Sequence, residues 1–254
     1  MALYLIGLGL SDEKDISVKG LEAVKKCRKV YLESYTAVLS CPVSRLEEFY
    51  GRKIIVAPRD MVEKQADVTI LEDAEKADTA LLVVGDPLAA TTHMDILERA
   101  KSRSIKTEVI HNASVMNAIA ATGLQLYKFG KTTSMPFPQK SFEPETAYDI
   151  IMQNRKNGSH TLVLLDLRPE KNMFITVNEG IKQLLKIELK RNEKVFTEQT
   201  KVVGCARIGS KGQQIIYGNA KDLLKIDFGK PMHCLVVPGD LHFMEEEILM
   251  KFQV

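Results

Sequence analysis

The sequence of 254 residues has no tryptophan, only four cysteines and no long apolar run. A membrane-spanning helix needs about 20 consecutive apolar residues. The apolar N-terminus MALYLIGLGL has no basic leader, and the charged stretch SDEKD follows it directly. We therefore expect a first strand at residues 3–8, and neither a signal peptide nor a membrane segment.

Neither sign of charge dominates the chain. There are 35 lysines and arginines against 33 acidic residues, which gives a net charge of +2. Dedicated nucleic-acid binders usually carry a strong basic excess or patch, so we expect no nucleic-acid partner. The basic clusters KKCRK (25–29) and KSRSIK (101–106) lie at expected helix ends, where positive charge favours the helix dipole.

The residue patterns of several catalytic classes are also missing. The cysteines, Cys27, Cys41, Cys205 and Cys234, form no CxxC pair and no metal-ligand spacing. In a chain of this length they indicate reduced thiols of a cytoplasmic protein. The five histidines make no metal-like pattern, and neither a G-x-S-x-G elbow nor a phosphate-binding G-x-x-x-x-G-K-[ST] loop occurs. We expect no metal site.

The first half of the chain alternates apolar strand runs with helical patterns. Strands are expected at 3–8, 29–34, 53–58, 78–85 and 106–112, and helices at 18–27, 44–51, 93–103 and 114–122. Ser17 and Thr92 are predicted N-caps, Thr92 with Asp95 in a capping-box-like arrangement, and Gly123 is predicted to end the last of these helices. This order predicts a mostly parallel sheet with helices on its faces.

A second set of elements follows residues 127–145, which hold three prolines and no helical period. Thr176 and Glu179 form a capping box. The other expected elements are a helix ending at Gly158, strands at 160–167, 200–208, 213–218 and 232–239, and helices at 180–191, 220–226 and 245–252. The predicted organisation is an N-terminal α/β domain (1–130), a connection (131–145) and a C-terminal α/β domain with a mixed sheet (146–254).

Three strands of the first half end on small or polar residues, at Gly7–Leu10, Gly85–Pro87 and Asn112–Ser114. In open α/β sheets, ligands bind outside the carboxyl ends of the strands. If these strands are parallel neighbours, the three ends lie along one edge. This edge is the candidate ligand site.

Two alternatives for this edge follow from the residues alone. Gly7, Gly9 and Glu33 partly match a dinucleotide fingerprint, but Asp12 replaces its third glycine and the helix is expected only after Ser17. A dinucleotide site is therefore disfavoured, whereas a plain strand-to-loop turn is not excluded. Asp86 can likewise serve a turn or bind an ammonium or hydroxyl of a ligand.

Four stretches of the sequence resemble diphthine synthases, diphthamide-biosynthesis methyltransferases with a fold like that of the tetrapyrrole methylases. They are residues 3–36, 83–97 (VVGDPLAATTHMDIL), 109–137 and 234–249 (CLVVPGDLHFMEEEIL). Corrin and haem-pathway relatives usually carry G-x-G-P-G at the first strand, where this chain has Leu8 and Leu10. The short connection from Asp166 to Thr176 is more similar to archaeal members than to eukaryotic ones.

The resemblance implies two α/β domains with an S-adenosylmethionine cleft between them. It implies methylation of the amino group on the 3-carboxyl-3-aminopropyl substituent of the modified histidine of elongation factor 2, with S-adenosylhomocysteine as by-product, and a homodimer. It assigns no catalytic residue. The cofactor contacts that it implies are Leu10, Asp86, Ala89, Ser114, Val115, Leu165, Ile208 and His233.

The expected chemistry agrees with the missing motifs. Methyl transfer from a sulfonium to an amine is a direct displacement, which needs no metal and no covalent enzyme intermediate. Asp86 is then expected to anchor the cofactor, whereas His233, in an apolar run, also fits an ordinary core histidine. Two other functions are still open: a methyltransferase of the same fold acting on a corrin or another small molecule, and a non-catalytic α/β scaffold.

Overall fold

The computed structural model describes residues 1–138 and 144–254. Contacts between Cα atoms divide the chain into two compact units, Met1–Ala118 and Ile119–Val254. Residues 119–130, predicted to end the N-terminal domain, thus belong by their contacts to the second unit. Part of the predicted connection, residues 139–143, lies outside the described residues.

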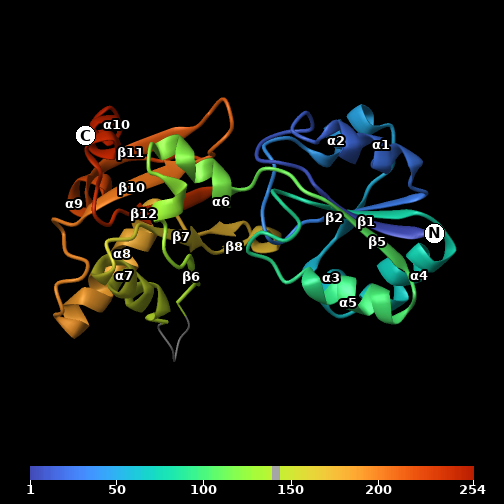
Figure 1. The fold of residues 1–254 in the computed structure, drawn as a ribbon, viewed down its shortest axis with the longest axis horizontal. Helices are drawn as coiled ribbons and strands as arrows, with labels where there is room; N and C mark the ends of the chain where they lie inside the picture. The colour runs from blue at the N-terminus through green and yellow to red at the C-terminus, as the bar shows by residue number, and fades with distance from the viewer. Residues whose placement is uncertain (139–143) are drawn as a thin grey trace. The chain divides into compact units, whose positions relative to one another are not determined.

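The first unit is built on a five-stranded sheet in the order β3-β2-β4-β1-β5, and all its pairings are parallel, as predicted (Figure 1). The strands are β1 (Ala2–Gly7), β2 (Lys29–Glu33), β3 (Ile55–Ala57), β4 (Thr79–Val83) and β5 (Lys106–Ile110). Because β1 lies between β4 and β5, the carboxyl ends of these three strands are neighbours.

Helices cover both faces of this sheet, since successive strand residues point to opposite faces. Leu5 and Leu81 belong to the apolar cluster under one set of helices, whereas Ile6 and Leu82 belong to the other cluster. The first set is α3 (Arg59–Glu63), α4 (Ile70–Lys76) and α5 (Met94–Ser102), and the second is α1 (Val18–Lys26) and α2 (Val43–Tyr50). Figure 1 shows the two sets on opposite sides of the sheet.

Three predictions for the first unit were wrong or incomplete. The short helices α3 and α4 were not predicted. The capping box at Thr92 is absent, because α5 begins at Met94 and the Asp95 carboxylate binds Arg99, 3.1 Å away, one turn further on. The helix expected at 114–122 is split into α6 (Val115–Ala118) and the 3-10 helix η2 (Ile119–Thr122), although Gly123 follows with a positive φ of 87° as expected of a helix end.

The second unit has a mixed sheet, as predicted, and its strand order is β11-β10-β12-β7-β6. Its strands are β6 (Thr133–Met135), β7 (Thr161–Leu165), β10 (Lys201–Ala206), β11 (Gln214–Asn219) and β12 (His233–Val237). The pairing of β6 with β7 is parallel and the others are antiparallel. Strand β6 lies in the proline-containing segment and was not predicted. Strands β8 (Leu167–Arg168) and β9 (Met173–Phe174) form a separate small pair.

Helices α7 (Thr146–Lys156), α8 (Val177–Arg191) and α9 (Ala220–Leu223) pack around a large apolar cluster of the second unit that includes Tyr148, Leu184 and Phe228. The unit also contains α10 (Phe243–Met250) and the 3-10 helices η3 (Leu126–Lys128) and η4 (Pro169–Lys171). The predicted capping box of α8 is confirmed, since the Glu179 N–H donates to Thr176 Oγ1 at 3.2 Å and Thr176 N–H donates to Glu179 Oε2 at 2.7 Å.

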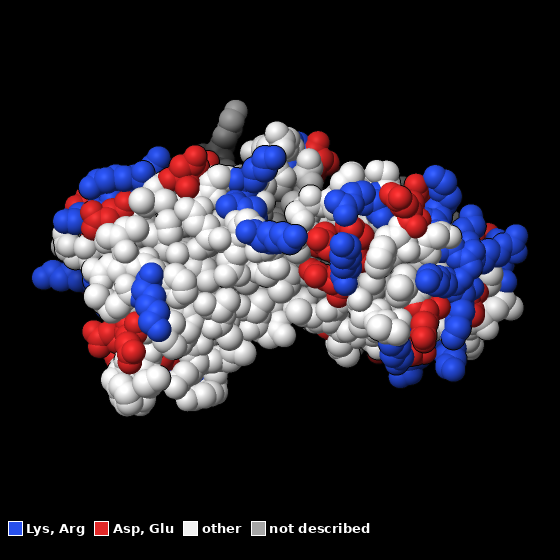
Figure 2. All heavy atoms as spheres, turned by 90° about the horizontal axis from the view of Figure 1, so that it is seen from above, with Lys and Arg blue, Asp and Glu red and all other residues white. Residues whose placement is uncertain are grey.

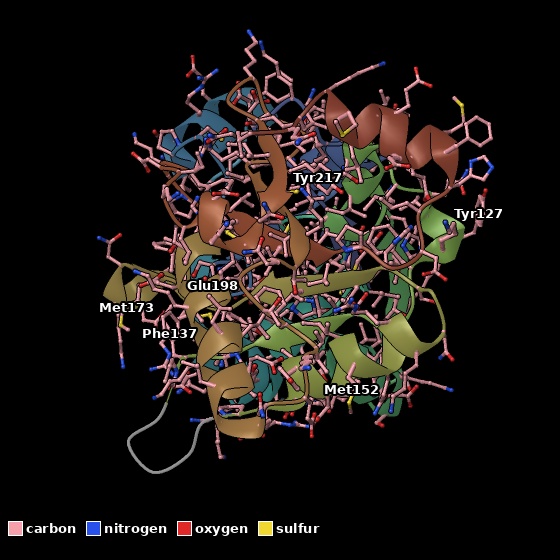
Figure 3. All side chains as sticks on the ribbon, turned by 90° about the vertical axis from the view of Figure 1, so that its left-hand side faces the viewer. Tyr127, Phe137, Met152, Met173, Glu198 and Tyr217 are labelled. Atoms are coloured by element: carbon pink, nitrogen blue, oxygen red, sulfur yellow. The ribbon has the colours of Figure 1, made fainter. Side chains whose placement is uncertain are left out.

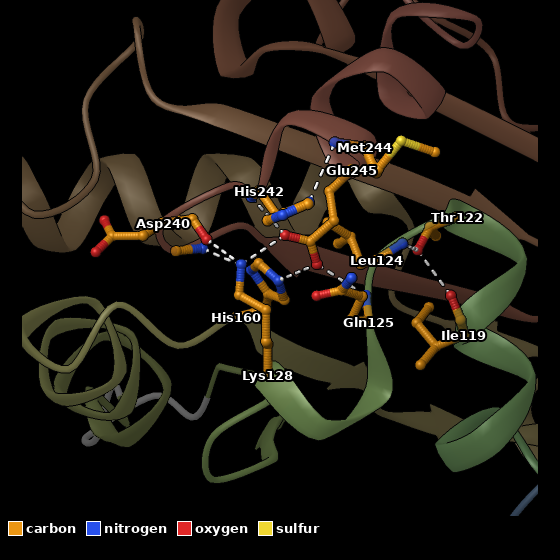
Figure 4. A network of polar contacts seen from close by, with 11 residues as sticks. Ile119, Thr122, Leu124, Gln125, Lys128, His160, Asp240, His242, Met244 and Glu245 are labelled. Atoms are coloured by element: carbon orange, nitrogen blue, oxygen red, sulfur yellow. Dashed lines mark hydrogen bonds and ion pairs between the residues drawn. The ribbon is translucent and has the colours of Figure 1, made fainter.

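A fully buried carboxylate, Glu245 on α10, ties α10 to η3 and to the start of β7 (Figure 4). Its Oε1 accepts from the Gln125 backbone N–H at 2.8 Å and from His160 Nε2 at 3.0 Å. Its Oε2 accepts from Lys128 Nζ at 2.6 Å and from the His242 N–H at 2.8 Å. Burial favours a raised pKa for Glu245, but these four donors outweigh it and lower the pKa to about 2.

The surface of the first unit carries both signs of charge. On the face seen in Figure 2, lysine and arginine side chains are interspersed with acidic ones over this unit, whereas a broad area of the second unit has few charges. In the part of the chain that the structure describes, no helix has the length and apolar character to span a membrane.

Candidate functional site

The three strand ends singled out by the sequence do meet at one edge of the first sheet. The Gly9 N–H donates to the Gly85 carbonyl at 3.2 Å, and the Gly85 N–H donates to the Gly9 carbonyl at 2.7 Å. Both glycines have positive φ values, 80° and 81°, which the exchange of hydrogen bonds requires and which other residues rarely adopt. The end of β1 is therefore fixed directly to the end of β4.

Asn112, just beyond β5, fixes the third strand end to the first. Its Nδ2 donates to the Gly7 carbonyl and to the Asp15 carbonyl, both at 2.9 Å, and its Oδ1 accepts from the Ala113 N–H at 2.7 Å. The sequence placed Asn112 at a strand end but not among the site residues. A side-chain amide suits this position because it can donate two hydrogen bonds and accept one.

Gly7 allows the three ends to approach closely. A Cβ atom at this position would lie 2.6 Å from the Gly85 carbonyl oxygen, 2.7 Å from Asn112 Cβ and 3.1 Å from Pro87 Cδ. Distances below 3.0 Å are not found between real Cβ atoms and their neighbours. Only glycine fits, so this residue is fixed by the packing of the site.

Asp86 bridges β4 and β5 with its carboxylate. Oδ1 accepts from the Leu88 N–H at 2.9 Å, and Oδ2 accepts from the Asn112 N–H at 3.1 Å and lies 2.8 Å from His111 Nδ1. Burial favours a raised pKa for Asp86, but these donors outweigh it and lower the pKa. A carboxylate has about four lone pairs, so one on Oδ1 has no donor among the described residues and can serve a ligand.

In the loop after β1, the Asp15 carboxylate is hydrogen-bonded to the backbone of the loop itself. This agrees with the sequence argument against a dinucleotide site. Asp15 Oδ2 accepts from the Leu10 N–H at 3.2 Å and from the Ser11 N–H at 2.7 Å. Helix α1 begins only at Val18, with Ser17 as its N-cap, as predicted. A helix N-terminus is thus not placed directly after the glycines, where a pyrophosphate would need it.

Glu33, the acidic residue weighed for a ribose contact, is also occupied. It is buried, and its carboxylate accepts from the backbone N–H groups of Tyr35 at 2.5 Å and Thr36 at 2.7 Å, and from the Thr36 hydroxyl. The residue therefore shapes the turn after β2, as a capping carboxylate does.

The other predicted contacts of the first unit lie on the loops that follow β4 and β5. The Ala89 N–H donates to the Asp86 carbonyl at 3.3 Å, and the next residue, Ala90, has a positive φ of 55°, which is strained for alanine. Ser114 is buried and its Oγ accepts from the Met116 N–H at 3.3 Å, next to Val115 at the start of α6. Leu10, Asp86 and Ser114 are thus each held at this edge by a hydrogen bond between a backbone N–H and a side-chain oxygen.

The three predicted contacts of the second unit lie together at one end of its sheet. Leu165 ends β7 and His233 begins β12, each one residue beyond the Leu164–Cys234 pair, and Ile208 follows β10 by two residues. His233 Nδ1 accepts from the Val177 N–H at 3.4 Å, and its Nε2 donates to the Lys230 carbonyl at 3.0 Å. Burial lowers the pKa of His233. Both ring nitrogens are used, so this imidazole can offer a ligand its ring face and backbone but no free nitrogen.

The arrangement can bind and orient a polar small molecule. It offers backbone groups at three adjoining strand ends, one carboxylate and one hydroxyl. Among the described residues, no group of three or more histidine, cysteine or acidic side chains is placed to hold a metal ion.

The sequence matches the family of Tetrapyrrole (Corrin/Porphyrin) Methylases over residues 2–224. The diphthine methyl ester synthase of Dictyostelium discoideum is 48% identical, with 100% of this chain and 99% of that protein covered. The diphthine synthase of Methanococcus aeolicus is also 48% identical, with 97% and 96% covered.

Solved structures give the same result. The crystal structure of a diphthine synthase from Entamoeba histolytica, described as putative, superimposes with a TM-score of 0.92 and 48% identity over 100% of this chain and 98% of that one. A second diphthine synthase crystal structure has a TM-score of 0.90 and 38% identity, with 100% and 96% covered. The fold predicted from the sequence is confirmed, and the chain belongs to the diphthine synthases, methyltransferases of the tetrapyrrole methylase family.

Proposed function

We propose that this methyltransferase uses S-adenosylmethionine to methylate the amino group of the modified histidine of elongation factor 2, in diphthamide biosynthesis. The observation that carries the proposal is the fixed junction of three strand ends, Gly7–Leu10, Gly85–Pro87 and Asn112–Ser114, in a chain of this methylase family. The names of its relatives support the acceptor, since they are diphthine synthases and diphthine methyl ester synthases.

The residues of the first unit fit such a cofactor. S-adenosylmethionine carries polar ends and a positive sulfonium, and supplies an activated methyl group when bound. Asp86 offers a negative charge and one unused lone pair. The small side chain of Ala89 lets a ligand approach the backbone, and the Ser114 hydroxyl can donate a hydrogen bond. We propose Leu10 and Val115 as apolar contacts beside them, and Leu165, Ile208 and His233 as contacts supplied by the second unit.

The chain contributes to the reaction mainly by orientation. Methyl transfer forms a nitrogen–carbon bond while the sulfur–carbon bond breaks, with the electron pair staying on sulfur. Holding the reacting groups in line can lower the barrier by roughly 7–11 kcal/mol. The fixed backbone of the three strand ends suits this task, because Asn112 and the Gly9–Gly85 pair prevent the strand ends from moving apart.

Replacing Asp86 by asparagine is expected to weaken S-adenosylhomocysteine binding by about tenfold, which is about 1.4 kcal/mol. The amide removes the charge and presents N–H donors where the carboxylate accepts from Leu88 and Asn112. Isothermal calorimetry measures the change. Asp12→Asn in the neighbouring loop serves as the control, and an unchanged affinity of Asp86→Asn would remove Asp86 from the site.

Incubation with methyl-labelled S-adenosylmethionine tests the acceptor. Elongation factor 2 that carries the 3-carboxyl-3-aminopropyl histidine is expected to gain label, whereas elongation factor 2 with an unmodified histidine is not. Label in a corrin or porphyrin but not in the protein would favour the small-molecule alternative. No binding of S-adenosylhomocysteine at millimolar concentration would favour a non-catalytic scaffold.

We further propose that the enzyme is a cytoplasmic homodimer. Tyr127 on η3 is 82% exposed, and Figure 3 shows it at the outer edge of the second unit. Phe243 is 68% exposed at the start of α10, which the Glu245 contacts hold next to η3. Exposed aromatic side chains of this kind favour a protein interface. The double variant Tyr127→Ser with Phe243→Ser is expected to behave as a monomer in analytical ultracentrifugation. An unchanged dimer would place the interface elsewhere.

A further inference from the structure

A cavity of about 290 Å³ opens within the first unit beside the loop that follows Asp86. Its lining comes from the loop after β2, from α3 and from the start of α5. The lining residues are Tyr35, Val62, Glu63, Thr92, His93, Asp95 and Ile96. Tyr35 follows β2 by two residues and His93 follows β4, and these strands are neighbours. The cavity therefore lies at the same carboxyl edge of the sheet as the junction of strand ends.

Two residues of this lining each have a buried polar atom without a hydrogen-bond partner in the described part of the chain: the Tyr35 hydroxyl and His93 Nε2. The two residues are only 6% and 2% exposed. Buried polar groups in native proteins are almost always paired, because an unpaired one has lost its hydrogen bonds to water without a replacement. Both atoms belong to residues that line one cavity, which points to a ligand as the missing hydrogen-bond partner.

The hydrogen bonds around these atoms define what each can offer. His93 Nδ1 lies 3.0 Å from the Pro87 carbonyl oxygen, which can only accept, so Nδ1 carries the proton and Nε2 of the neutral ring is an acceptor. Burial, followed by the charges of Glu33 and Glu63, raises the pKa of Tyr35. Its hydroxyl thus stays protonated and can donate.

The side chains around the cavity carry charges of both signs. The Arg59 guanidinium lies over the Tyr35 ring, 5.0 Å from its centroid. Glu63 and Asp95 line the cavity with carboxylates, of which Glu63 lies 3.7 Å from Arg59 and Asp95 lies 3.1 Å from Arg99. A ligand that offers an N–H to His93 and an acceptor to Tyr35 matches this combination, with negative side chains available to a cationic nitrogen.

We propose that this cavity binds an α-amino acid group, with its ammonium donating to His93 Nε2 and its carboxylate accepting from the Tyr35 hydroxyl. This rests on the proposed function, which supplies two such groups: the 3-carboxyl-3-aminopropyl substituent of the acceptor histidine and the methionine part of S-adenosylmethionine. Both carry one amine and one carboxylate on the same carbon. The position of the cavity at the carboxyl edge suits either source.

Tyr35→Phe and His93→Gln test the proposal, with Met94→Gln as the matched control. Met94 is next to His93, is 54% exposed and does not line the cavity. Calorimetry gives the Kd of S-adenosylhomocysteine and of 5′-methylthioadenosine, which lacks the amino acid group. Methyl transfer to the modified elongation factor gives KM and kcat for the acceptor, and thermal melting reports on the fold.

If the cavity binds the acceptor, both variants raise the acceptor KM by about tenfold, while kcat changes less and the Kd of S-adenosylhomocysteine stays within about twofold of wild type. If it binds the cofactor, the Kd of S-adenosylhomocysteine rises by the same factor and that of 5′-methylthioadenosine does not.

The proposal is overturned if KM and Kd both match the Met94→Gln control, even where Tm falls, because the two atoms then serve only the fold. Wild-type enzyme that binds S-adenosylhomocysteine but transfers no methyl group would refute the proposed acceptor, and the two Kd values would still decide about the cavity.

Discussion

Replacing Gly7 by alanine is expected to abolish measurable S-adenosylhomocysteine binding and to lower the free energy of unfolding by about 1–3 kcal/mol. The added methyl group would overlap the Gly85 carbonyl oxygen at 2.6 Å and Asn112 Cβ at 2.7 Å. Neither neighbour can move freely, because Gly85 is hydrogen-bonded to Gly9 and Asn112 holds two carbonyls. The strand ends must therefore separate, which displaces the backbone groups that are proposed to bind the cofactor. A displacement of about 1 Å is enough to lose such a geometry.

The control for this substitution is Gly51→Ala, at the end of α2. Gly51 has a positive φ of 68°, but a Cβ atom there meets nothing within 4 Å. It is expected to cost about 1 kcal/mol through backbone strain alone and to leave binding unchanged. Urea unfolding and calorimetry on both variants separate the two effects. A Gly7→Ala protein that binds S-adenosylhomocysteine like wild type would show that the three strand ends do not form the cofactor site.

Replacing Glu245 by glutamine is expected to lower the free energy of unfolding by about 3–5 kcal/mol, because it breaks a buried ion pair on one side only. The Lys128 ammonium loses its carboxylate, and the amide cannot accept from Gln125, His160, His242 and Lys128 together. These contacts join η3 and β7 to α10 (Figure 4), so the C-terminal helix is expected to detach first. Glu246→Gln, an exposed neighbour, is the control and is expected to unfold like wild type.

The pH dependence of stability follows from the same carboxylate. Its pKa is lowered from 4.5 to about 2 in the folded protein, so the unfolded chain binds the proton more tightly. The contribution of Glu245 to the free energy of unfolding is therefore complete above about pH 4.5. It is lost as the pH falls toward 2, by about 3 kcal/mol in all. Unfolding measured from pH 6 to 3 should lose less stability in Glu245→Gln than in wild type. Parallel curves would show that Glu245 is not the group responsible.

The parallel character of the first sheet and the mixed character of the second could be predicted from the sequence, because most of their strands have strong local signals. The apolar runs of β1 and β4 stand out, and the capping box at Thr176 marks α8 without any tertiary information. Strand β6 was missed because three residues in a proline-containing segment have no periodicity, and pairing with β7 alone makes them a strand. The Thr92 box failed because Asp95 has a competing partner, Arg99, one turn away.

The candidate site could be predicted as an edge of the sheet but not as a set of contacts. Glycines at strand ends marked Gly7, Gly9 and Gly85, since positive φ and close approach restrict those positions to glycine. Asn112 was not predicted as a site residue because its bonds reach residues about 100 positions away. The cavity at Tyr35 and His93 was not predicted for the same reason, since it joins two loops that only the strand order brings together.

Mass spectrometry of the target histidine is the most direct test of the proposed reaction. Elongation factor 2 carrying the 3-carboxyl-3-aminopropyl histidine is incubated with the enzyme and S-adenosylmethionine, digested and fragmented. We predict that the modified histidine gains one or more methyl groups on its amino nitrogen, and that Gly7→Ala enzyme adds none. Methyl groups on any other residue, or none from wild-type enzyme that binds S-adenosylhomocysteine, would contradict it.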